Sequence, residues 1–254
     1  FKIIMKYNSD INVLGSLPDW NLIPVFLNQD INDIRSNVGL QSVTAIKTDK
    51  SIRRFEKAIT GTLIKFANDN VSQLITGFLN KEQISNDSLL LIFWNASFNN
   101  NLLFYLNQKV FFPALYSGRI TIKKDEVIAC LKELKETDED LKGWSEITIT
   151  TTASKYLTLL KKFGVMEGSL NKTISHPYLS DKMFVLFIYW LLAIENSSNI
   201  INSQWLQYCF LENQVFLERL MQKKYTKFFN ITYSVDKLKI ETIYSYQEIY
   251  YAAS

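Results

Sequence analysis

The stretch from Trp144 to Ser180 constrains the fold more than any other part of this 254-residue chain. Its first part has the periodicity of a helix that turns about 100° per residue. Apolar residues fall on one side of that helix, at Ile149, Ala153, Tyr156, Leu157, Leu160 and Phe163. The opposite side carries hydroxyl and ammonium groups and no apolar residue, at Thr151, Lys155, Thr158 and Lys162. The pattern predicts an amphipathic helix from about Thr148 to Phe163 that buries the first side and presents the second to solvent.

A helix end and a small basic hairpin are expected next. Gly164 predicts the end of the helix, because glycine tolerates the positive φ of a helix terminus. Val165 to Ile174 is typical of two short extended pieces around Gly168-Ser169 and Asn171-Lys172. Together with an amphipathic helix over about Asp125 to Lys135, this is the pattern of a winged helix-turn-helix unit. An ordinary amphipathic helix with a surface loop would show the same pattern and remains the alternative.

The aromatic content points to the fold class. The chain holds 17 Phe, 13 Tyr and 5 Trp against 8 Gly and 4 Pro. This balance favours packed helices over a turn-rich β sandwich, so we expect a mostly α fold with short β-hairpins. Further helices are expected after the capping pair Thr48-Asp49, over Ser88–Phe112 with a break at Asn99-Asn100-Asn101 and an end at Pro113, over Met183–Ile194, and from Trp205 to about Lys223.

The order of these elements suggests three parts. Residues 1–118 would form a helical domain, and residues 119–180 the winged-helix-like unit. Residues 181–254 would add a helical pair and a β-hairpin, because Phe228–Tyr233 and Leu238–Ile243 alternate around a turn. Two helices followed by a hairpin would fit a second, degenerate winged unit.

Neither a membrane span nor a secretory signal is expected. The most apolar segment, Met183 to Ile194, has twelve residues, whereas a bilayer core needs about 20. The N-terminal stretch shows no secretory signal. Cys130 and Cys209 lie far apart in apolar helical patterns, which argues against a disulfide framework. We therefore expect a cytoplasmic protein with a buried helix over Met183 to Ile194.

Catalytic and metal-binding motifs are not found. His176 is the only histidine, and there is no GxxxxGK(S/T) loop, GxGxxG turn, HExxH or CxxC. One histidine and two dispersed cysteines cannot assemble a typical zinc site. The acidic run Glu136 to Asp140 lacks a complementary ligand set, so a solvated turn is the simpler interpretation. We expect no enzyme activity, no metal and no cofactor.

Nucleic-acid binding fits the residues better. The net charge of +3 is compatible with a nucleic-acid partner without requiring one. Lysines neutralise phosphates, and small polar residues suit a helix in the major groove but discriminate bases poorly. We therefore expect double-stranded DNA as partner, bound with modest sequence preference. The candidate residues are Thr151, Lys155, Thr158, Lys162, Asn171 and Lys172, with Arg53, Arg54 and Lys57 on the helix after Thr48; for these last three, a solvated helix face is the simpler alternative.

Three stretches give the chain a family resemblance. They are TDKSIRRFEKAITGTL (Thr48 to Leu63), LLLIFWNASFNNNLLFYLNQKV (Leu89 to Val110) and WSEITITTTASKYLTLLKKFGVMEG (Trp144 to Gly168). Their order and spacing resemble the BrxA family of BREX phage-defence systems. The resemblance implies a mostly helical fold with a winged-helix-like part, similarity to helical RNA-binding antitermination factors, and a DNA-binding role beside other BREX subunits. The exposed row departs from the family pattern, because it holds Thr and Lys where the family is rich in Arg.

Two further functions stay open. The chain would act as a scaffold if its aromatic and apolar surface holds other defence subunits without touching nucleic acid. Alternatively, the basic helix over residues 50–65 would bind structured RNA.

Overall fold

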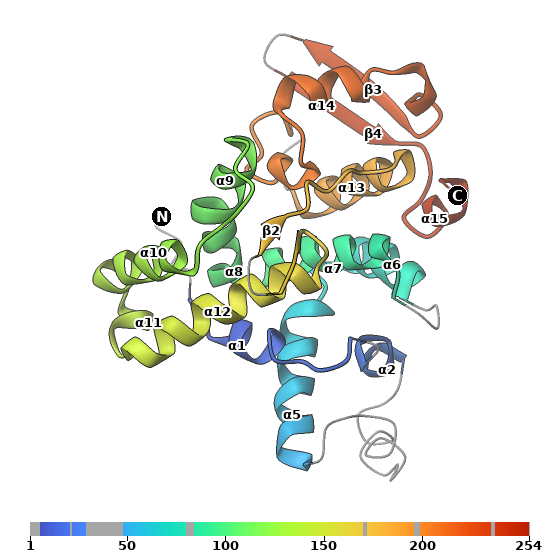
Figure 1. The fold of residues 1–254 in the computed structure, drawn as a ribbon. Coiled ribbons are helices and arrows are strands. Elements are labelled where there is room, and N and C mark those ends of the chain that lie inside the picture. Colours follow the sequence, from blue (N-terminus) through green and yellow to red (C-terminus); the bar gives the residue numbers. More distant parts are fainter. Residues whose placement is uncertain are drawn as a thin grey trace. The chain divides into compact units, whose positions relative to one another are not determined.

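The computed structural model describes residues 6–20, 22–28, 48–79, 84–169, 172–195, 199–234 and 237–253. In these residues the fold is mostly α, with two small antiparallel hairpins, which confirms the predicted class (Figure 1). The chain forms two compact units. The first unit comprises Phe1–Lys65 and Lys81–His176, and the second comprises Phe66–Asn80 and Pro177–Ser254. These two units do not show which parts of the chain fold independently, so the division into residues 1–118, 119–180 and 181–254 stays a prediction.

The first unit is built from helices, with a small hairpin after the longest described helix. Its elements are α1 (Asp10–Leu14), α2 (Leu22–Asn28), α5 (Asp49–Ala58), the π-helical η1 (Ile59–Leu63), α7 (Asn86–Asn99), α8 (Asn101–Leu106), the π-helical η2 (Asn107–Phe111), α9 (Phe112–Tyr116), α10 (Lys124–Thr137), α11 (Glu139–Lys142), α12 (Glu146–Lys162), β1 (Met166–Glu167) and β2 (Thr173–Ile174).

The predicted break in the long apolar segment is confirmed. Asn100 separates α7 from α8, and its side chain accepts a hydrogen bond from the Leu103 amide at 2.9 Å. The predicted end at Pro113 is wrong, because Pro113 lies in the first turn of α9. A proline is tolerated there, since the amide that it lacks would have no partner within the helix.

A buried hydrogen-bond chain ties α12 to the core of the first unit. The Tyr156 hydroxyl donates to Asn107 Oδ1 at 3.0 Å, Asn107 Nδ2 donates to Ser97 Oγ at 3.1 Å, and Ser97 donates to the Phe93 carbonyl at 2.8 Å. The side chains of Tyr156, Asn107 and Ser97 are all buried. It therefore fixes the depth at which α12 sits on α7 and η2.

We expect Tyr156→Phe to lower the free energy of unfolding by about 1.5 kcal/mol, because it removes one buried hydrogen bond without changing the volume of the core. Urea denaturation followed by circular dichroism measures the change. Tyr251→Phe is the matched control, since Tyr251 is exposed. Equal midpoints for the two variants would contradict the role given to the Tyr156 hydroxyl.

The second unit surrounds the apolar helix α13. Its elements are α6 (Asp69–Leu79), α13 (Asp181–Ile194), the short 3-10 turns η3 (Leu206–Cys209) and η4 (Lys223–Tyr225), α14 (Asn213–Leu220), β3 (Phe229–Ser234), β4 (Lys237–Thr242) and α15 (Ile249–Ala252). Met183 to Leu191 of α13 are all buried, as predicted. Among the described residues, no helix is both long enough and apolar enough to cross a bilayer.

The helix predicted from Trp205 to about Lys223 is wrong in its first half. Phe210 has a φ of 59°, in the left-handed region, and this conformation ends η3 and breaks the helical path. Helix α14 begins only at Asn213.

An ion-pair network anchors the start of α13. Asp181 accepts hydrogen bonds from Lys224 Nζ at 2.7 and 2.8 Å, from the Tyr225 hydroxyl at 2.7 Å and from Arg219 at 3.1 Å. The bonds from Lys224 and then Tyr225 do most to lower the pKa of Asp181, from its usual 3.8 to about 2. The network therefore favours the ionised carboxylate.

The lowered pKa makes the second unit sensitive to acid. A carboxylate with a depressed pKa stabilises the fold above its unfolded pKa, and this contribution is lost as the pH falls through the folded value. For Asp181 the loss is expected between about pH 4 and pH 2. Asp181→Asn should therefore be less stable than the parent at about pH 5, and the gap should close towards about pH 2. Urea denaturation across this range measures it, and a gap that stays constant would contradict the assignment.

Candidate nucleic-acid interface

Helix α12 lies between α10 and α1 in the first unit (Figure 1). Ser145 caps it, accepting a hydrogen bond from the Thr148 amide at 3.2 Å, so the helix begins two residues earlier than predicted. The predicted inner side is confirmed, because Ile149, Ala153, Tyr156, Leu157, Leu160 and Phe163 are all buried. At the C-terminal end of the helix, the Phe163 ring packs between two other rings. Its centre lies 5.3 Å from that of Phe93 and 5.2 Å from that of Trp20.

The hairpin predicted after α12 is present. Gly164 has a φ of 77° and follows the helix end, as expected. Strands β1 and β2 pair with Met166 opposite Ile174, and Gly168 has a φ of 84° in the connection. A third extended segment joins them, because Thr121 bridges Thr173 and the Ile174 amide donates to the Ile120 carbonyl at 2.8 Å. The segment before α10 is thus tied to the hairpin after α12.

Helix α1 covers much of the side of α12 that was expected to face solvent. Gly15 follows α1 and lies so close that a Cβ placed on it would be 2.7 Å from the Lys155 carbonyl oxygen. Asn12 of α1 donates to Thr152 Oγ1 at 3.0 Å, and the Lys162 ammonium donates to the Leu17 carbonyl. Lys155 and Lys162 are consequently half-buried.

The exposed side of α12 is therefore rotated from the predicted row. Thr151 is exposed as predicted, whereas Thr158 is half-buried beneath Lys172, whose ammonium donates to its hydroxyl at 3.2 Å. Ser154 and Lys161 are exposed instead. Ile147, which directly precedes the predicted helix, is 79% exposed and adds an apolar residue to this surface.

Four lysines gather where α12 meets the hairpin. This basic cluster consists of Lys155, Lys161, Lys162 and Lys172. Burial and then Lys155 lower the pKa of Lys162, and burial followed by Lys161 and Lys155 lowers the pKa of Lys172. Within the described residues, no carboxylate forms an ion pair with any of the four. The cluster is therefore a region of uncompensated positive charge.

The remaining candidates occupy other places. Asn171 lies outside the described residues. Arg53, Arg54 and Lys57 are exposed on α5, which contacts the same helix α1. Burial raises the pKa of Asp10, and the nearby charge of Lys57 lowers it by a smaller amount, so the pKa of Asp10 is raised overall. The structure thus gathers Lys155, Thr158, Lys162 and Lys172, and places the α5 cations on a separate helix.

Lys161 is the residue that sequence reasoning missed. It follows Thr158 by three residues and therefore lies near the same side of the helix. The predicted row followed Lys155 and Lys162, and nothing in the sequence showed that α1 covers that row. A basic residue in the last helical turn beside a predicted hairpin was the available signal.

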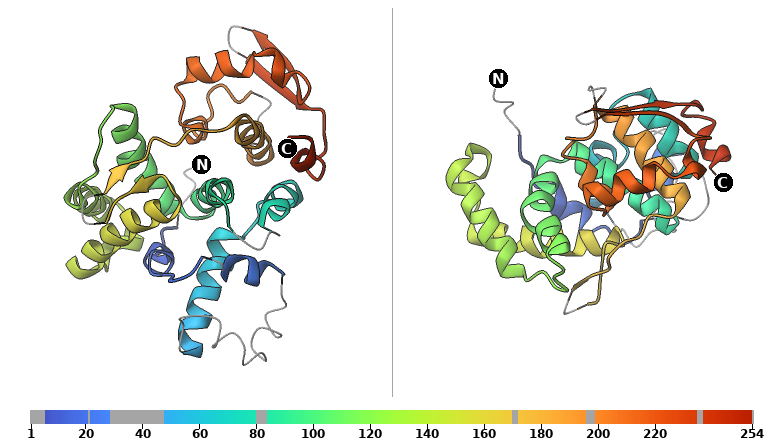
Figure 2. Two further views of the ribbon diagram at one scale, coloured as in Figure 1. Left: turned by 45° about the vertical axis from the view of Figure 1, so that its right-hand side comes forward. Right: turned by 90° about the horizontal axis from the view of Figure 1, so that it is seen from above.

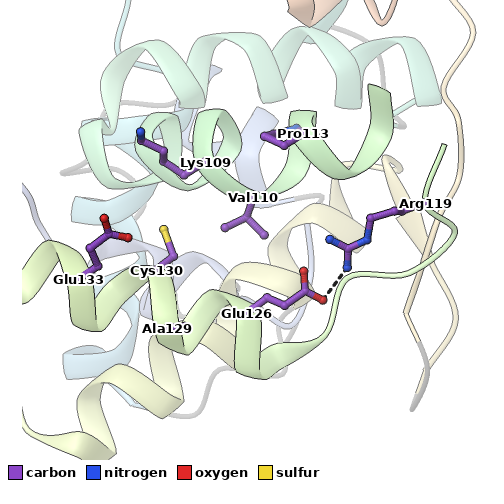
Figure 3. Close-up of a pocket in the computed structure, with 8 residues that line it drawn as sticks. All are labelled: Lys109, Val110, Pro113, Arg119, Glu126, Ala129, Cys130 and Glu133. Atoms are coloured by element: carbon purple, nitrogen blue, oxygen red, sulfur yellow. Dashed lines mark hydrogen bonds and ion pairs between the residues drawn. The ribbon is translucent and has the colours of Figure 1, made fainter. Parts of the chain in front are cut away.

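A groove between α10 and the stretch from η2 to α9 is the other feature that suggests a site (Figure 3). It has a volume of about 400 Å³, and Arg119 and Glu126 form an ion pair at 2.6 Å along it. Burial raises the pKa of the Cys130 thiol, which leaves it a poor nucleophile. No group of metal-ligating side chains occurs among the described residues. The absence of enzyme activity stays a prediction.

Comparisons with known proteins give the family. A solved crystal structure, of an uncharacterized protein from Magnetospirillum magneticum, has the same fold with a TM-score of 0.52 at 14% identity, over 76% of this chain and 100% of that one. No curated protein is similar enough in sequence to count as a relative. The model of the BrxA family matches residues 22–188. Because that match spans well over half of the chain, the protein belongs to the BrxA family, a family of defence proteins associated with BREX systems.

Proposed function

We propose that the chain is a non-enzymatic accessory protein of a BREX system that binds double-stranded DNA, chiefly through phosphates. The observation that carries this proposal is the basic cluster. Four neighbouring lysines without a carboxylate partner repel one another, and a polyanion that brings phosphates among them removes that repulsion. Lysine recognises phosphate as a point charge, which suits tracking of a DNA backbone better than reading of bases.

The order of elements around the cluster supports a winged-helix mode of binding. An extended segment at Thr121 precedes α10, then α11 and α12 follow, and the β1–β2 hairpin pairs back to Thr121. In this arrangement α12 would approach the major groove, and the hairpin would lie over the adjacent backbone. Apart from Glu146 and Lys161, the exposed residues of α12 have short side chains or are apolar, namely Ile147, Thr151 and Ser154. Modest sequence preference follows from those side chains.

Two acidic residues near this region, Glu146 and Glu139, do not oppose the proposal. Glu146 pairs with Lys132 at 2.7 Å, and Glu139 pairs with Lys142. Glu146 begins α12, whereas Lys161 lies in its last turn, roughly 22 Å away at 1.5 Å per residue. That separation exceeds a Debye length of about 8 Å at physiological salt, so the carboxylate is screened from phosphates held at the cluster.

A salt-titrated binding assay of the purified chain tests the proposal, with duplex DNA, single-stranded DNA and structured RNA as ligands. We expect duplex DNA to bind most tightly, with a slope of roughly −3.6 in log K against log salt if all four lysines contact phosphates. A lack of duplex binding at about 50 mM salt would contradict the proposal. Preference for structured RNA would instead favour the basic helix α5, where Arg53 and Arg54 are exposed.

Exposed apolar side chains favour a second role, in assembly. Ile147, Tyr178 and Tyr251 are each more than three-quarters exposed. Membership of the BrxA family suggests other BREX subunits as the proteins that would cover them. Stable co-purification of a partner subunit, without a mobility shift on duplex DNA, would favour a scaffold over a DNA-binding protein.

A further inference from the structure

The β3–β4 hairpin of the second unit leaves the outer edge of β3 open (Figure 2). Ser234 lies opposite Lys237, three positions further along the chain, and a pair this close in sequence exchanges backbone hydrogen bonds. The Ile243 amide donates to the Phe228 carbonyl at 2.9 Å. This pair lies an even number of positions from Ser234 and Lys237 along both strands, so it follows the same pattern. Alternate residues therefore bond within the hairpin. The backbone groups of Phe229, Ile231 and Tyr233 point away from β4, along the outer edge of β3.

The outer edge of β4 is engaged at one amide, and no such bond is described for the outer edge of β3. On β4, the outward amide of Leu238 donates to Asn199 Oδ1 at 3.1 Å. On β3, none of the outward amides and carbonyls of Phe229, Ile231 and Tyr233 has a hydrogen-bond partner in the described part of the chain. The faces are also distinct: Phe229 packs on Tyr189 with ring centres 5.5 Å apart, whereas Asn230 and Thr232 on the other face are exposed.

Strand β3 also lacks the features that normally guard an exposed edge. Its sequence, FNITYS, holds no charge, no proline and no glycine, and it is rich in residues that favour strands. By contrast, β4 carries Lys237, Lys239 and Glu241. An edge with unpaired backbone groups and no guarding charge is suited to accept a further strand.

The charges around this edge indicate what that strand would be. Lys223 and Lys227 precede β3, and Lys237 and Lys239 lie across from it on β4, all exposed. The described carboxylate on the hairpin, Glu241, is paired with Lys239 at 2.6 Å. A second copy of the chain would bring the same lysines to the sheet and be repelled, whereas an acidic segment would be attracted.

We propose that the outer edge of β3 binds an extended, acidic segment of a partner protein by β-augmentation. Side chains alternate between the faces of a strand, so every second residue of the segment would contact Ile231 and Tyr233. Tyr233 is 48% exposed and offers an uncovered apolar surface on that side. The intervening residues would lie on the face that carries Lys237 and Lys239. The bound segment therefore alternates apolar and acidic residues.

The probe for this proposal is a synthetic peptide of about ten residues that alternates valine and glutamate, compared with one that alternates valine and lysine. Amide signals of the full chain are followed by nuclear magnetic resonance. We expect the acidic peptide to shift and protect the amides of Phe229, Ile231 and Tyr233, and the basic peptide to bind at least about tenfold more weakly. No binding by either peptide at millimolar concentration, or equal binding by both, overturns the proposal.

Ile231→Pro provides the decisive variant. It removes an amide that points outward and leaves the bonds to β4 intact, a position at which an edge strand tolerates proline. Binding of the acidic peptide should fall by at least about tenfold, while Ile231→Val, which keeps the amide, should bind like the parent. Unchanged amide signals of β4 show that the hairpin still forms. Equal binding by the proline and valine variants overturns the proposal.

Two further outcomes are separable. If the same β3 amides shift with protein concentration in the absence of peptide, a second copy occupies the edge, and the acidic partner is wrong. The proposal does not rest on DNA binding, because the edge and the basic cluster lie on different units. A chain that fails to bind duplex DNA is still expected to bind the acidic peptide.

Discussion

Replacing Lys161 and Lys172 together by glutamine is expected to weaken duplex-DNA binding by roughly one to two orders of magnitude at about 0.1 M salt. Both lysines belong to the basic cluster: Lys161 lies in the last turn of α12, and Lys172 comes directly before β2. Each phosphate contact contributes about 0.9 to the slope of log K against log salt, so the slope should fall by about 1.8. A mobility-shift or anisotropy titration at several salt concentrations measures both quantities.

The control carries the same change of charge elsewhere in the first unit. Lys132 and Lys142 each pair with a carboxylate, so Lys132→Gln with Lys142→Gln removes two charges that are already compensated. This variant should bind duplex DNA nearly as well as the parent. If both double variants lose affinity equally, net charge alone explains the loss and the cluster has no special role.

Lys155 and Lys162 are less suitable targets, although both belong to the cluster. The Lys162 ammonium donates to the Leu17 carbonyl, and the Lys155 backbone lies against Gly15. Their replacement would disturb the docking of α1 as well as the charge, so a loss of binding would have two causes. Lys161 is exposed on α12 and avoids this difficulty.

Arg219→Ala is expected to lower the free energy of unfolding by about 3 kcal/mol, a larger effect than that of Tyr156→Phe. Arg219 is only 8% exposed. Its guanidinium donates to the Leu179 carbonyl at 2.7 Å, to the Tyr225 hydroxyl at 3.0 Å and to Asp181 at 3.1 Å. It also lies 4.4 Å from the centre of the Phe184 ring. Removing it leaves a cavity and takes a donor from a buried carbonyl.

Lys224→Ala is the matched control for Arg219→Ala, because Lys224 binds the same carboxylate from an exposed position. Because this ion pair is about half exposed, and Tyr225 and Arg219 still donate to Asp181, the midpoint of urea denaturation should move much less than for Arg219→Ala. A shift as large as that of Arg219→Ala would mean that the charge on Asp181, and not burial of the guanidinium, determines the stability of this network.

The inner side of α12 was predictable because a local pattern determines it. Six apolar residues at helical spacing must share one side of any helix, and all six are buried. The break at Asn100 was predictable for the same reason, since an asparagine before a new apolar run can cap the helix that it begins. Both predictions depend only on neighbours in the sequence.

The outer side of α12 was not predictable, because a distant segment determines it. Gly15 lies against Lys155, and Leu17 accepts a hydrogen bond from Lys162, which is 145 positions further along the chain. The error at Phe210 has another cause. A non-glycine residue at positive φ breaks the helix there, although local propensity allowed it to continue.

Because α1 packs closely on α12, the fold needs residues that lie outside the segment matched by the family. The family match begins at residue 22, after α1, and ends at residue 188, inside α13. A fragment cut to those limits would lose the contacts that Asn12 makes with Thr152 and that Leu17 makes with Lys162. It would also end α13 six residues before Ile194. We expect such a fragment to aggregate on expression, so that the shortest useful piece of this protein must begin before Tyr7, whose amide binds Asp140 at 2.8 Å.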